Sequence, residues 1–257
     1  MKHVNVALFV PDEGCLHRCS FCNQKTISGF QKRPEPIDVI SACETALSGK
    51  TDVRGGEIAF FGGSFTAIER GYMLSLLKTA KSYLDRGFFS GIRISTRPDC
   101  INEEILTLLK EYGVTSIELG CQSMDDEVLR LNERGHTAKD SENACRLIKS
   151  FSFELGVQMM TGLFGDTDEK TLETAKRLIS LSPDTVRIYP TVVLKNTKLE
   201  ELYSSGEYRA QTLEEATELC SRLLKLFNES GVRVIRLGLH SGGNVEEGYV
   251  AGAYHPA

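Results

Sequence analysis

The sequence predicts an α/β fold, a full or partial TIM-like (β/α)6 barrel, from two observations. Short apolar runs alternate with amphipathic segments along the chain, as in strands joined by helical crossovers. The runs are mostly uninterrupted by polar residues, which is typical of parallel strands covered on both faces. The predicted strands are Val4–Val10, Glu57–Phe61, Ile92–Ser95, Ser116–Leu119, Leu155–Met160, Thr185–Tyr189 and Arg233–Leu237. Active sites of such barrels lie at the C-terminal ends of the strands.

Capping signals place the helices between these strands. Asn102 is a good N-cap for an amphipathic segment. Thr212 and Glu215 have the spacing of a capping box. Thr167 precedes two acidic residues, which suit the positive end of a helix dipole. Residues 125–150 predict two short helices.

Length and composition indicate an ordinary globular chain. With 257 residues, 41% of them hydrophobic and 25% charged, it can bury a full core. We expect a single domain over residues 1–257, and residues 252–257 do not resemble a finished terminus, so we expect a C-terminal portion to be missing. Apolar runs are too short to span a bilayer, and the first strand leaves no room for a signal peptide. Together with unpaired cysteines, this predicts a cytoplasmic protein.

The net charge of −5 is against a surface that holds nucleic acid by phosphate neutralisation alone. A local basic patch stays open as an interpretation, although solvated loop charges explain it equally well. The residues concerned are Arg18, Lys25, Lys32 and Arg33.

Three cysteines lie on one short polar loop after the first strand. Cys15, Cys19 and Cys22 have the spacing C-x3-C-x2-C, and thiolates this close in sequence can meet at one metal centre. Soft thiolate ligands select zinc, copper(I) or iron–sulfur clusters. A [4Fe–4S] cluster normally takes four cysteines, so three ligands leave one iron open. The alternative is a zinc site completed by His17, His3 or a C-terminal histidine.

The other five cysteines are predicted to be structural. Most of them fall in helical or strand patterns, where a free thiol is usually a small buried hydrophobe. They are Cys43, Cys100, Cys121, Cys145 and Cys220.

Glycine and polar residues follow the predicted strands. The second strand is followed by Gly62-Gly63-Ser64, and paired glycines allow close backbone approach to a ligand. Ser95 ends the third strand and begins Ser-Thr-Arg-Pro-Asp, while Gln122 follows the fourth. Tight turns also use double glycines, and ordinary strand-end hydrogen bonds explain Ser95 and Gln122 equally well.

The order of these motifs along one chain resembles the radical SAM superfamily. The motifs are the cysteine loop with an aromatic residue before its last cysteine, the double glycine, Gly-x-Gln-Ser at 120–123, Asn-x-Arg-Gly-His at 132–136 and Thr-Gly-Leu-x-Gly-Asp-Thr at 161–167. They are most similar to the branch with oxygen-independent coproporphyrinogen III oxidase and the elongator catalytic subunit. The stretches 95–99 and 189–203 favour the radical SAM half of the elongator subunit, without its acetyltransferase domain. Elongator enzymes space the first two cysteines further apart.

The resemblance implies two cofactors, a [4Fe–4S] cluster and S-adenosylmethionine (SAM), which the open iron chelates. Carried over by position, Cys15, Cys19 and Cys22 ligate the cluster, and Phe21 lines the adenine pocket. The implied SAM contacts are Gly62, Gly63 and Ser64 through their backbone for the amino group, Ser95 and Gln122 for the ribose, and Arg134 for the carboxylate. The implied substrate-side residues are Tyr189, Lys195, Arg236 and His240.

The resemblance also implies a function. It predicts reductive cleavage of SAM to a 5′-deoxyadenosyl radical, an electron donor such as flavodoxin or ferredoxin, and modification of a tRNA wobble uridine. The alternatives are a coproporphyrinogen-type oxidative decarboxylase and a zinc-stabilised, non-enzymatic binding module.

Overall fold

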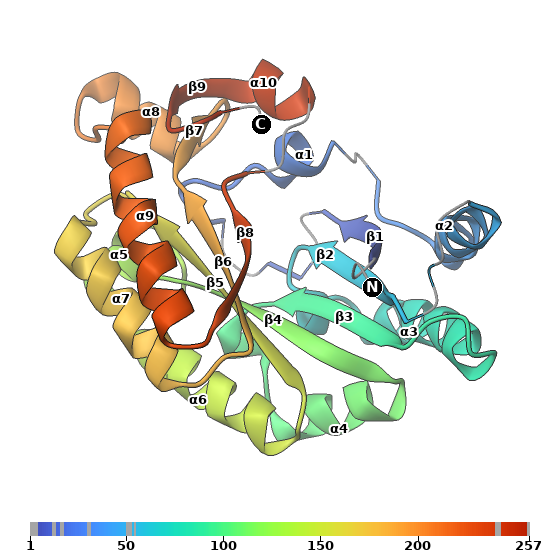
Figure 1. Ribbon diagram of the computed structural model, residues 1–257. Helices are drawn as coiled ribbons and strands as arrows, with labels where there is room; N and C mark the ends of the chain where they lie inside the picture. Colours follow the sequence, from blue (N-terminus) through green and yellow to red (C-terminus); the bar gives the residue numbers. More distant parts are fainter. Residues whose placement is uncertain are drawn as a thin grey trace.

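A curved, fully parallel sheet forms the body of the protein (Figure 1). The computed structural model describes residues 5–11, 14–15, 18–29, 32–49, 53, 55–239 and 243–255. Seven strands pair in the order β1-β2-β3-β4-β5-β6-β8, and each pairing is parallel. Their bounds are β1 Asn5–Val10, β2 Glu57–Gly62, β3 Gly91–Thr96, β4 Val114–Gln122, β5 Glu154–Thr161, β6 Thr185–Pro190 and β8 Arg233–Leu237. The sheet curls into a half-barrel, which confirms the predicted partial barrel.

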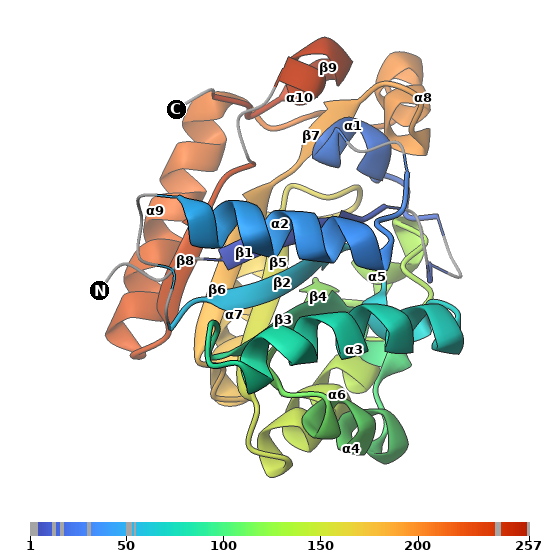
Figure 2. The ribbon, with the colours of Figure 1, turned by 90° about the vertical axis from the view of Figure 1, so that its right-hand side faces the viewer.

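Most of the helices cover the convex face of the sheet, and α1, α8 and α10 lie above one of its ends (Figure 1). The bounds are α1 Gln24–Ser28, α2 Pro36–Ser48, α3 Arg70–Asp85, α4 Glu103–Glu111, α5 Asp126–Leu131, α6 Ala138–Ser150, α7 Asp168–Ser180, α8 Lys198–Ser205, α9 Leu213–Glu229 and α10 Gly243–Gly248. Two short 3-10 helices span Phe65–Ala67 and Pro98–Cys100. Figure 2 shows α2 and α3 side by side over β1 to β3.

The helix signals of the sequence are confirmed. Asn102 caps α4 by accepting a hydrogen bond from Ile105 N–H at 2.9 Å. Thr212 forms the expected capping box with Glu215, and Thr167 caps α7. Residues 125–150 form α5 and α6, of which α6 is a full 13-residue helix. No helix among the described residues is long and apolar enough to cross a membrane.

Strand alternation separates an apolar outer layer from a polar interior. Ile92 and Ile94 are fully buried in the large core beneath the helices. Arg93 lies between them in sequence and pairs instead with carboxylates of β2, β4 and β5. Because side chains alternate along a strand, the concave face of the half-barrel carries charged groups.

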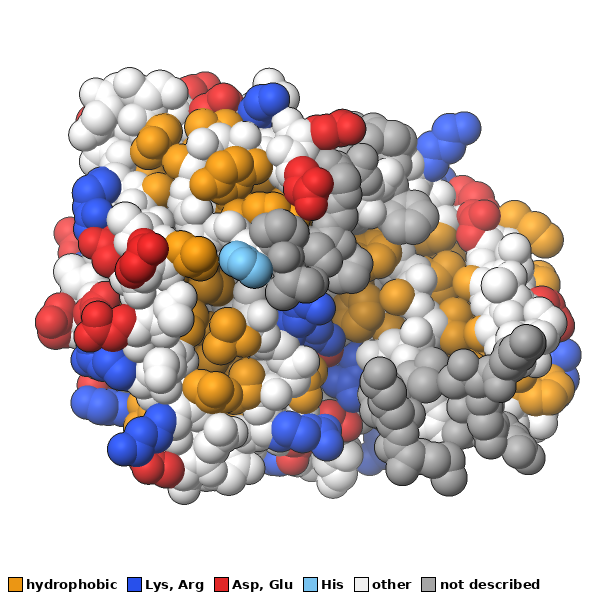
Figure 3. All heavy atoms as spheres, turned by 45° about the horizontal axis from the view of Figure 1, so that its top comes forward, with side chains coloured by type: hydrophobic (Ala, Val, Ile, Leu, Met, Phe, Trp, Pro, Cys, Tyr) orange, Lys and Arg blue, Asp and Glu red, His pale blue; other side chains and the backbone are white. Residues whose placement is uncertain are grey.

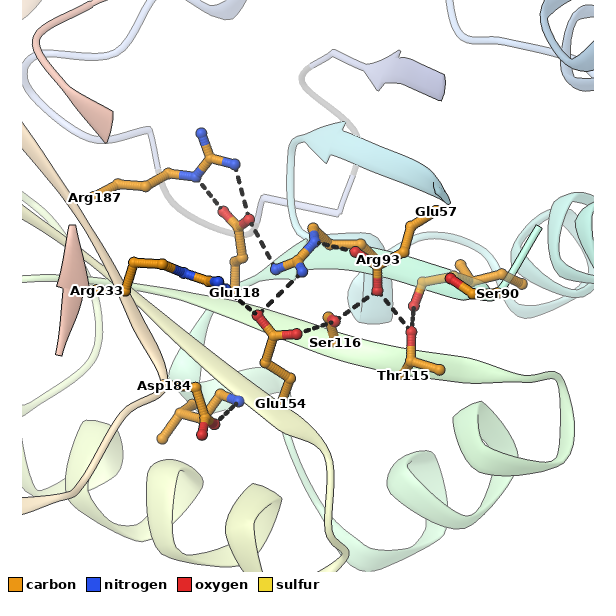
Figure 4. A network of polar contacts seen from close by, with 12 residues as sticks. Glu57, Ser90, Arg93, Thr115, Ser116, Glu118, Glu154, Asp184, Arg187 and Arg233 are labelled. Carbon is orange, nitrogen blue, oxygen red and sulfur yellow. Dashed lines mark hydrogen bonds and ion pairs between the residues drawn. The ribbon is translucent and has the colours of Figure 1, made fainter. Parts of the chain in front are cut away.

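Those charged groups form a network across the lower half of the interior, where the strands begin (Figure 4). Arg93 donates to Glu57 at 2.7 Å, to Glu154 at 3.1 Å and to Glu118 at 3.4 Å. Burial alone would raise the pKa of Glu57, but Arg93 and the hydroxyls of Ser116 and Thr115 outweigh it and lower that pKa. This floor, as we call the network, closes one end of the half-barrel.

A small second sheet, which the sequence analysis missed, lies above the other end. Strands β7 Val192–Leu194 and β9 Tyr249–Gly252 pair antiparallel. With α1, α8 and α10 they form what we call the upper lobe (Figure 1). Two small apolar clusters hold this lobe together, one around Val193 and Leu199 and one around Val192 and Val245.

Candidate active site

The cysteine loop lies at the C-terminal end of β1, under the upper lobe. Buried Ser20 anchors it on both sides. Its N–H donates to the Asn132 carbonyl at 3.1 Å, and its hydroxyl donates to Asn132 Oδ1 at 2.8 Å. Its own carbonyl accepts a hydrogen bond from Leu199 N–H of α8 at 2.8 Å. The loop is therefore joined to the chain after β4 and to the upper lobe.

The same loop lies against the turn after β2. Gly14 has φ +71°, and a Cβ atom there would come within 2.3 Å of the Ser64 carbonyl oxygen. Only glycine can make this approach. Gln24 donates to the Gly62 carbonyl at 2.9 Å, and Gly63 N–H donates to the Val10 carbonyl at 2.8 Å. The loop and the glycine pair, which the sequence placed 40 residues apart, are neighbours.

Two arginines reach the cysteines from the ends of the next strands. Arg134 Nη1 lies 3.0 Å from Cys19 Sγ, and its Nη2 donates to the Gly120 carbonyl at 2.5 Å. Arg97 forms a double hydrogen bond with Asp99, at 2.9 Å for each bond, and also donates to the Arg134 carbonyl. The site therefore holds two buried guanidinium groups beside buried Cys19.

The environment of Cys15 places it within the same group. Desolvation and the neighbouring Cys19 raise the pKa of the Cys15 thiol. The Ser64 N–H, Arg97 and Arg134 act in the opposite direction. Cys15, Cys19, the glycine turn and both arginines therefore lie close enough to influence one another.

Several buried polar atoms at this end have no hydrogen-bond partner among the residues that the structure describes. They are Ser95 Oγ, Gln122 Oε1, Arg97 Nη1 and Arg134 Nε. An unpaired buried polar group costs about 1–3 kcal/mol. Four such groups at neighbouring strand ends therefore indicate a polar ligand.

The backbone is shaped to direct two of these side chains. Gln122 has φ +66°, which is strained for a residue with a side chain. The pairing of β4 with β5 shifts register between Gly120 and Gln122. A Cβ at Gly120 would lie 3.0 Å from Gln122 Nε2 and 3.4 Å from Arg134 Nη2. The bare glycine leaves room for both side chains.

The cysteines are not yet arranged as a metal site. Within the described residues, no three Cys, His, Asp or Glu side chains are grouped closely enough to hold a metal ion. Cys19 is buried, Cys22 is half-buried and Cys15 is exposed. The prediction that the three thiols share one cluster therefore stays a prediction. His3 and His17, the zinc alternatives, lie outside the described residues.

Some predicted residues lie in other surroundings. Phe21 packs against the apolar cluster of Val193 and Leu199, and its place beside an adenine stays a prediction. Lys195 belongs to the upper lobe, where its Nζ donates to the Glu247 carbonyl at 2.9 Å. His240 lies outside the described residues.

Sequence reasoning missed three functional candidates. It cited Arg97, Asn132 and His136 only as parts of motifs, with no role assigned to them. Burial and the neighbouring charges of Arg134 and Arg97 together lower the pKa of His136 to about 4. A signal was available, because all three occur in motifs that follow strands, where this fold gathers its functional groups.

A parallel half-barrel with cysteines and unpaired polar groups at its strand ends has the architecture of an α/β enzyme, a class whose active sites lie at that end of the strands. The Radical SAM superfamily matches residues 9–178, and the Radical_SAM C-terminal domain matches residues 183–257. The chain belongs to the radical SAM superfamily of enzymes.

Several curated proteins are similar to parts of the chain. An uncharacterized protein of Methanocaldococcus jannaschii is 41% identical over 129 residues, which are 49% of this chain and 39% of that protein. The tRNA uridine(34) acetyltransferase of Methanocaldococcus infernus is 34% identical over 131 residues, 50% of this chain and 24% of that protein. Elongator complex protein 3 of Mus musculus is 33% identical over 190 residues, 66% of this chain and 35% of that protein. The matches thus span well under half of these relatives' lengths.

Solved structures share the fold. The Elp3 of Methanocaldococcus infernus, with an N-terminal deletion, has a TM-score of 0.71 at 23% identity and covers 95% of this chain and 61% of that one. Coproporphyrinogen III oxidase of Escherichia coli has a TM-score of 0.61 at 18% identity and covers 88% of this chain and 52% of that one. At these identities the likeness concerns the fold alone.

Proposed function

We propose that this enzyme reductively cleaves SAM at a [4Fe–4S] cluster held by Cys15, Cys19 and Cys22. When bound, the cluster supplies the electron that releases the 5′-deoxyadenosyl radical from SAM. An electron donor such as flavodoxin or ferredoxin is required, and the cytoplasm is the expected compartment, where free cysteines persist.

The chain's own residues bind and orient SAM. Arg134, beside Cys19, pairs with the SAM carboxylate. Backbone atoms of Gly62, Gly63 and Ser64 contact its amino group. The Gly62 carbonyl and the Gly63 N–H already have partners in the chain. The SAM amino group is therefore contacted by the other backbone groups of this turn.

The ribose is held from β3 and β4. Ser95 Oγ and Gln122 Oε1 are buried without partners, and vicinal hydroxyls of a ribose would satisfy both. The polar surroundings thus fit SAM, and three thiols fit the chemistry of a cluster. The proposal requires the thiols of Cys15, Cys19 and Cys22 to share one cluster.

One observation supports the proposal: Arg134 lies beside Cys19, and buried polar atoms of Ser95, Gln122 and Arg134 have no hydrogen-bond partner among the described residues. The test is anaerobic reconstitution of the chain with iron and sulfide. We expect brown protein with about four irons that forms 5′-deoxyadenosine from SAM when a reductant is added.

Cys19→Ala should abolish both the colour and SAM cleavage. Cys220→Ala is the matched control, because Cys220 is a buried thiol of α9 packed in the core. It should keep both properties. Cleavage that survives Cys19→Ala, or colourless protein with stoichiometric zinc, would refute the assignment.

As the reaction served by this chemistry, we propose modification of a tRNA wobble uridine. The similarity to tRNA uridine(34) acetyltransferase and to elongator complex protein 3 supports it. A coproporphyrinogen-type decarboxylation has only the shared fold in its favour, and membership of an enzyme family is against the non-enzymatic zinc module. Anaerobic incubation with cellular RNA, followed by nucleoside mass spectrometry, would reveal a changed uridine.

A further inference from the structure

The upper part of the half-barrel interior contains a basic side chain that the sequence analysis did not consider. Arg187 of β6 donates from Nε to Glu118 at 2.7 Å and from Nη2 to Glu118 at 2.9 Å. Such a double contact fixes the plane of the guanidinium. Figure 4 shows its third nitrogen, Nη1, pointing away from the carboxylates of the floor.

Glu118 holds this arginine in place, and all of its own hydrogen-bond acceptor sites are occupied. Besides Arg187 it accepts hydrogen bonds from Gln158 at 3.0 Å and from Arg93 at 3.4 Å, and it is 1% exposed. A buried carboxylate with four donors has no capacity left to bind a ligand itself. Its role is to hold Arg187, and one face of that guanidinium also lies 5.4 Å from the Phe61 ring centroid.

A second guanidinium lies near Arg187. Arg236 of β8 donates to the carbonyls of Gly238 at 3.0 Å and Leu239 at 2.8 Å. Among the residues that the structure describes, it forms no ion pair with a carboxylate. Arg187 and Arg236 are register partners of β6 and β8, and Tyr189 follows two residues after Arg187 on β6. Burial raises the pKa of the Tyr189 hydroxyl, while the charges of Arg187 and Arg236 and a hydrogen bond with Arg187 oppose that rise.

Uncompensated positive charge therefore gathers near the middle of the concave face. Arg236 has no neutralising carboxylate in the described ranges. The third guanidinium nitrogen of Arg187 points towards the open part of the interior. With the upper end tilted forward, basic side chains lie within the hollow of this face beside hydrophobic ones (Figure 3). This pattern suits a ligand with a negative group and an apolar or planar part.

We propose that Arg187, Arg236 and Tyr189 form a subsite for an oxyanion, either a carboxylate or a phosphate, of the substrate on which this enzyme acts. The inference rests on the proposed function, since the interior lies below the SAM site. Arg187 and Arg236 bind the oxyanion by charge-assisted hydrogen bonds, and the Tyr189 hydroxyl adds a neutral donor. Glu118 is a positioning residue that acts through Arg187.

The test uses anaerobic equilibrium dialysis of the full chain, reconstituted and saturated with SAM. The labelled probes are uridine 5′-monophosphate and acetate, each compared with its neutral counterpart, uridine or acetamide. We expect Arg236→Gln to weaken binding of one charged probe about tenfold, because the loss of one charge-assisted hydrogen bond has an effect of about this size. Among the described residues Arg236 pairs with no carboxylate, so its replacement leaves no buried carboxylate without a partner and this variant should fold normally. Arg187→Lys keeps the charge, loses the double contact and should also weaken binding.

Arg209→Gln is the matched control, because Arg209 is exposed and pairs only with Glu215 on the surface. If Arg236→Gln loses affinity only for the nucleotide, the oxyanion is assigned as a phosphate. If it loses affinity only for acetate, the oxyanion is assigned as a carboxylate. The proposal is overturned if Arg236→Gln binds both probes within twofold of the unmodified protein, or if neither charged probe binds more tightly than its neutral counterpart.

The dialysis is repeated without cluster or SAM. Protein that fails to cleave SAM but loses oxyanion binding in Arg236→Gln would refute the proposed function and support the subsite. Normal SAM cleavage, together with oxyanion binding in Arg236→Gln equal to that of the unmodified protein, would support the proposed function and refute the subsite.

Discussion

The two ends of the half-barrel interior differ in how their buried polar groups are satisfied. At the floor, Arg93 contacts three carboxylates, and Glu57 accepts hydrogen bonds from two hydroxyls besides Arg93. At the upper end, Ser95, Gln122, Arg97 and Arg134 each bury a polar atom without a partner. Asn5 Oδ1 and Thr185 Oγ1 are exceptions near the floor.

The difference separates a structural network from a binding site. Each unpaired buried group destabilises the folded chain by about 1–3 kcal/mol, and the floor shows that this chain can pair buried charges completely. The unpaired groups therefore gather where a ligand supplies the missing partners. A complete network holds strands together, and an incomplete one binds a ligand.

The largest expected effect comes from breaking the floor. Arg93→Met removes the cation that links the three carboxylates of Glu57, Glu118 and Glu154. Removing one partner of a buried ion pair typically costs about 3–5 kcal/mol. Urea unfolding followed by circular dichroism should show a loss of this size.

Arg70→Met is the matched control for that change. Its ion pair with Glu104 is exposed, and exposed pairs contribute about 0–1 kcal/mol. If both variants lost the same stability, the floor would not be the structural network we describe.

A second prediction separates the two ends by pH. The pKa of buried His136 is lowered from 6.5 to about 4, so folding favours its neutral form. Its contribution is complete above about pH 6.5 and is lost as the pH falls towards 4, by up to ~3 kcal/mol. Unfolding free energies across this range should fall in the unmodified protein and stay flatter in His136→Leu.

The contribution of the floor to stability should change in a lower pH range. The pKa of Glu57 is lowered from its ordinary 4.5, so its contribution is present above about pH 4.5 and is lost below it. The charged neighbours of His136 are Arg134, Arg97 and Asp99, and Glu57 is not among them. A steep loss of unfolding free energy between pH 6.5 and 4.5 in His136→Leu would contradict this division between the two ends.

A third prediction concerns the unpaired groups themselves. Ser95→Ala removes a buried hydroxyl without a partner. It should raise the stability of the cofactor-free chain by up to ~1 kcal/mol, and it should weaken SAM binding about tenfold, the loss of one hydrogen bond. Urea unfolding and dialysis with labelled SAM measure the two effects. A destabilised variant with unchanged SAM affinity would mean that Ser95 is structural.

Most of the fold was predictable, because its main signals are local. The seven strands of the large sheet match the apolar runs to within a few residues, and the caps at Asn102, Thr167 and Thr212 are formed. The β7–β9 sheet was not predictable. The three residues of β7 pair with a strand more than fifty residues later, and so short a run carries no periodicity.

The site was predictable in part, since strand order brings strand ends together. Arg134 contacts Cys19, Gln122 and Arg134 both lie against Gly120, and Ser95 lies near the end of β3. That these side chains hold one cofactor stays a prediction. Arg187 was missed, because an arginine inside an apolar strand gives no sign of whether it faces the interior. The double contact with Glu118 depends on strands that are not adjacent in the sheet.

The smallest effect is expected at Lys195, which the sequence suggested as a substrate residue. Its Nζ already donates to the Glu247 carbonyl, and its N–H donates to the Gly248 carbonyl. The comparison of the two ends therefore groups it with structural residues. Lys195→Ala keeps the backbone bond, so we expect a stability change within about 0.5 kcal/mol, as for other exposed positions, and SAM cleavage within twofold. A much larger loss of cleavage with unchanged stability would show that a polar group with its partners satisfied can still act on a ligand, and the rule drawn from the floor would not hold at the upper end.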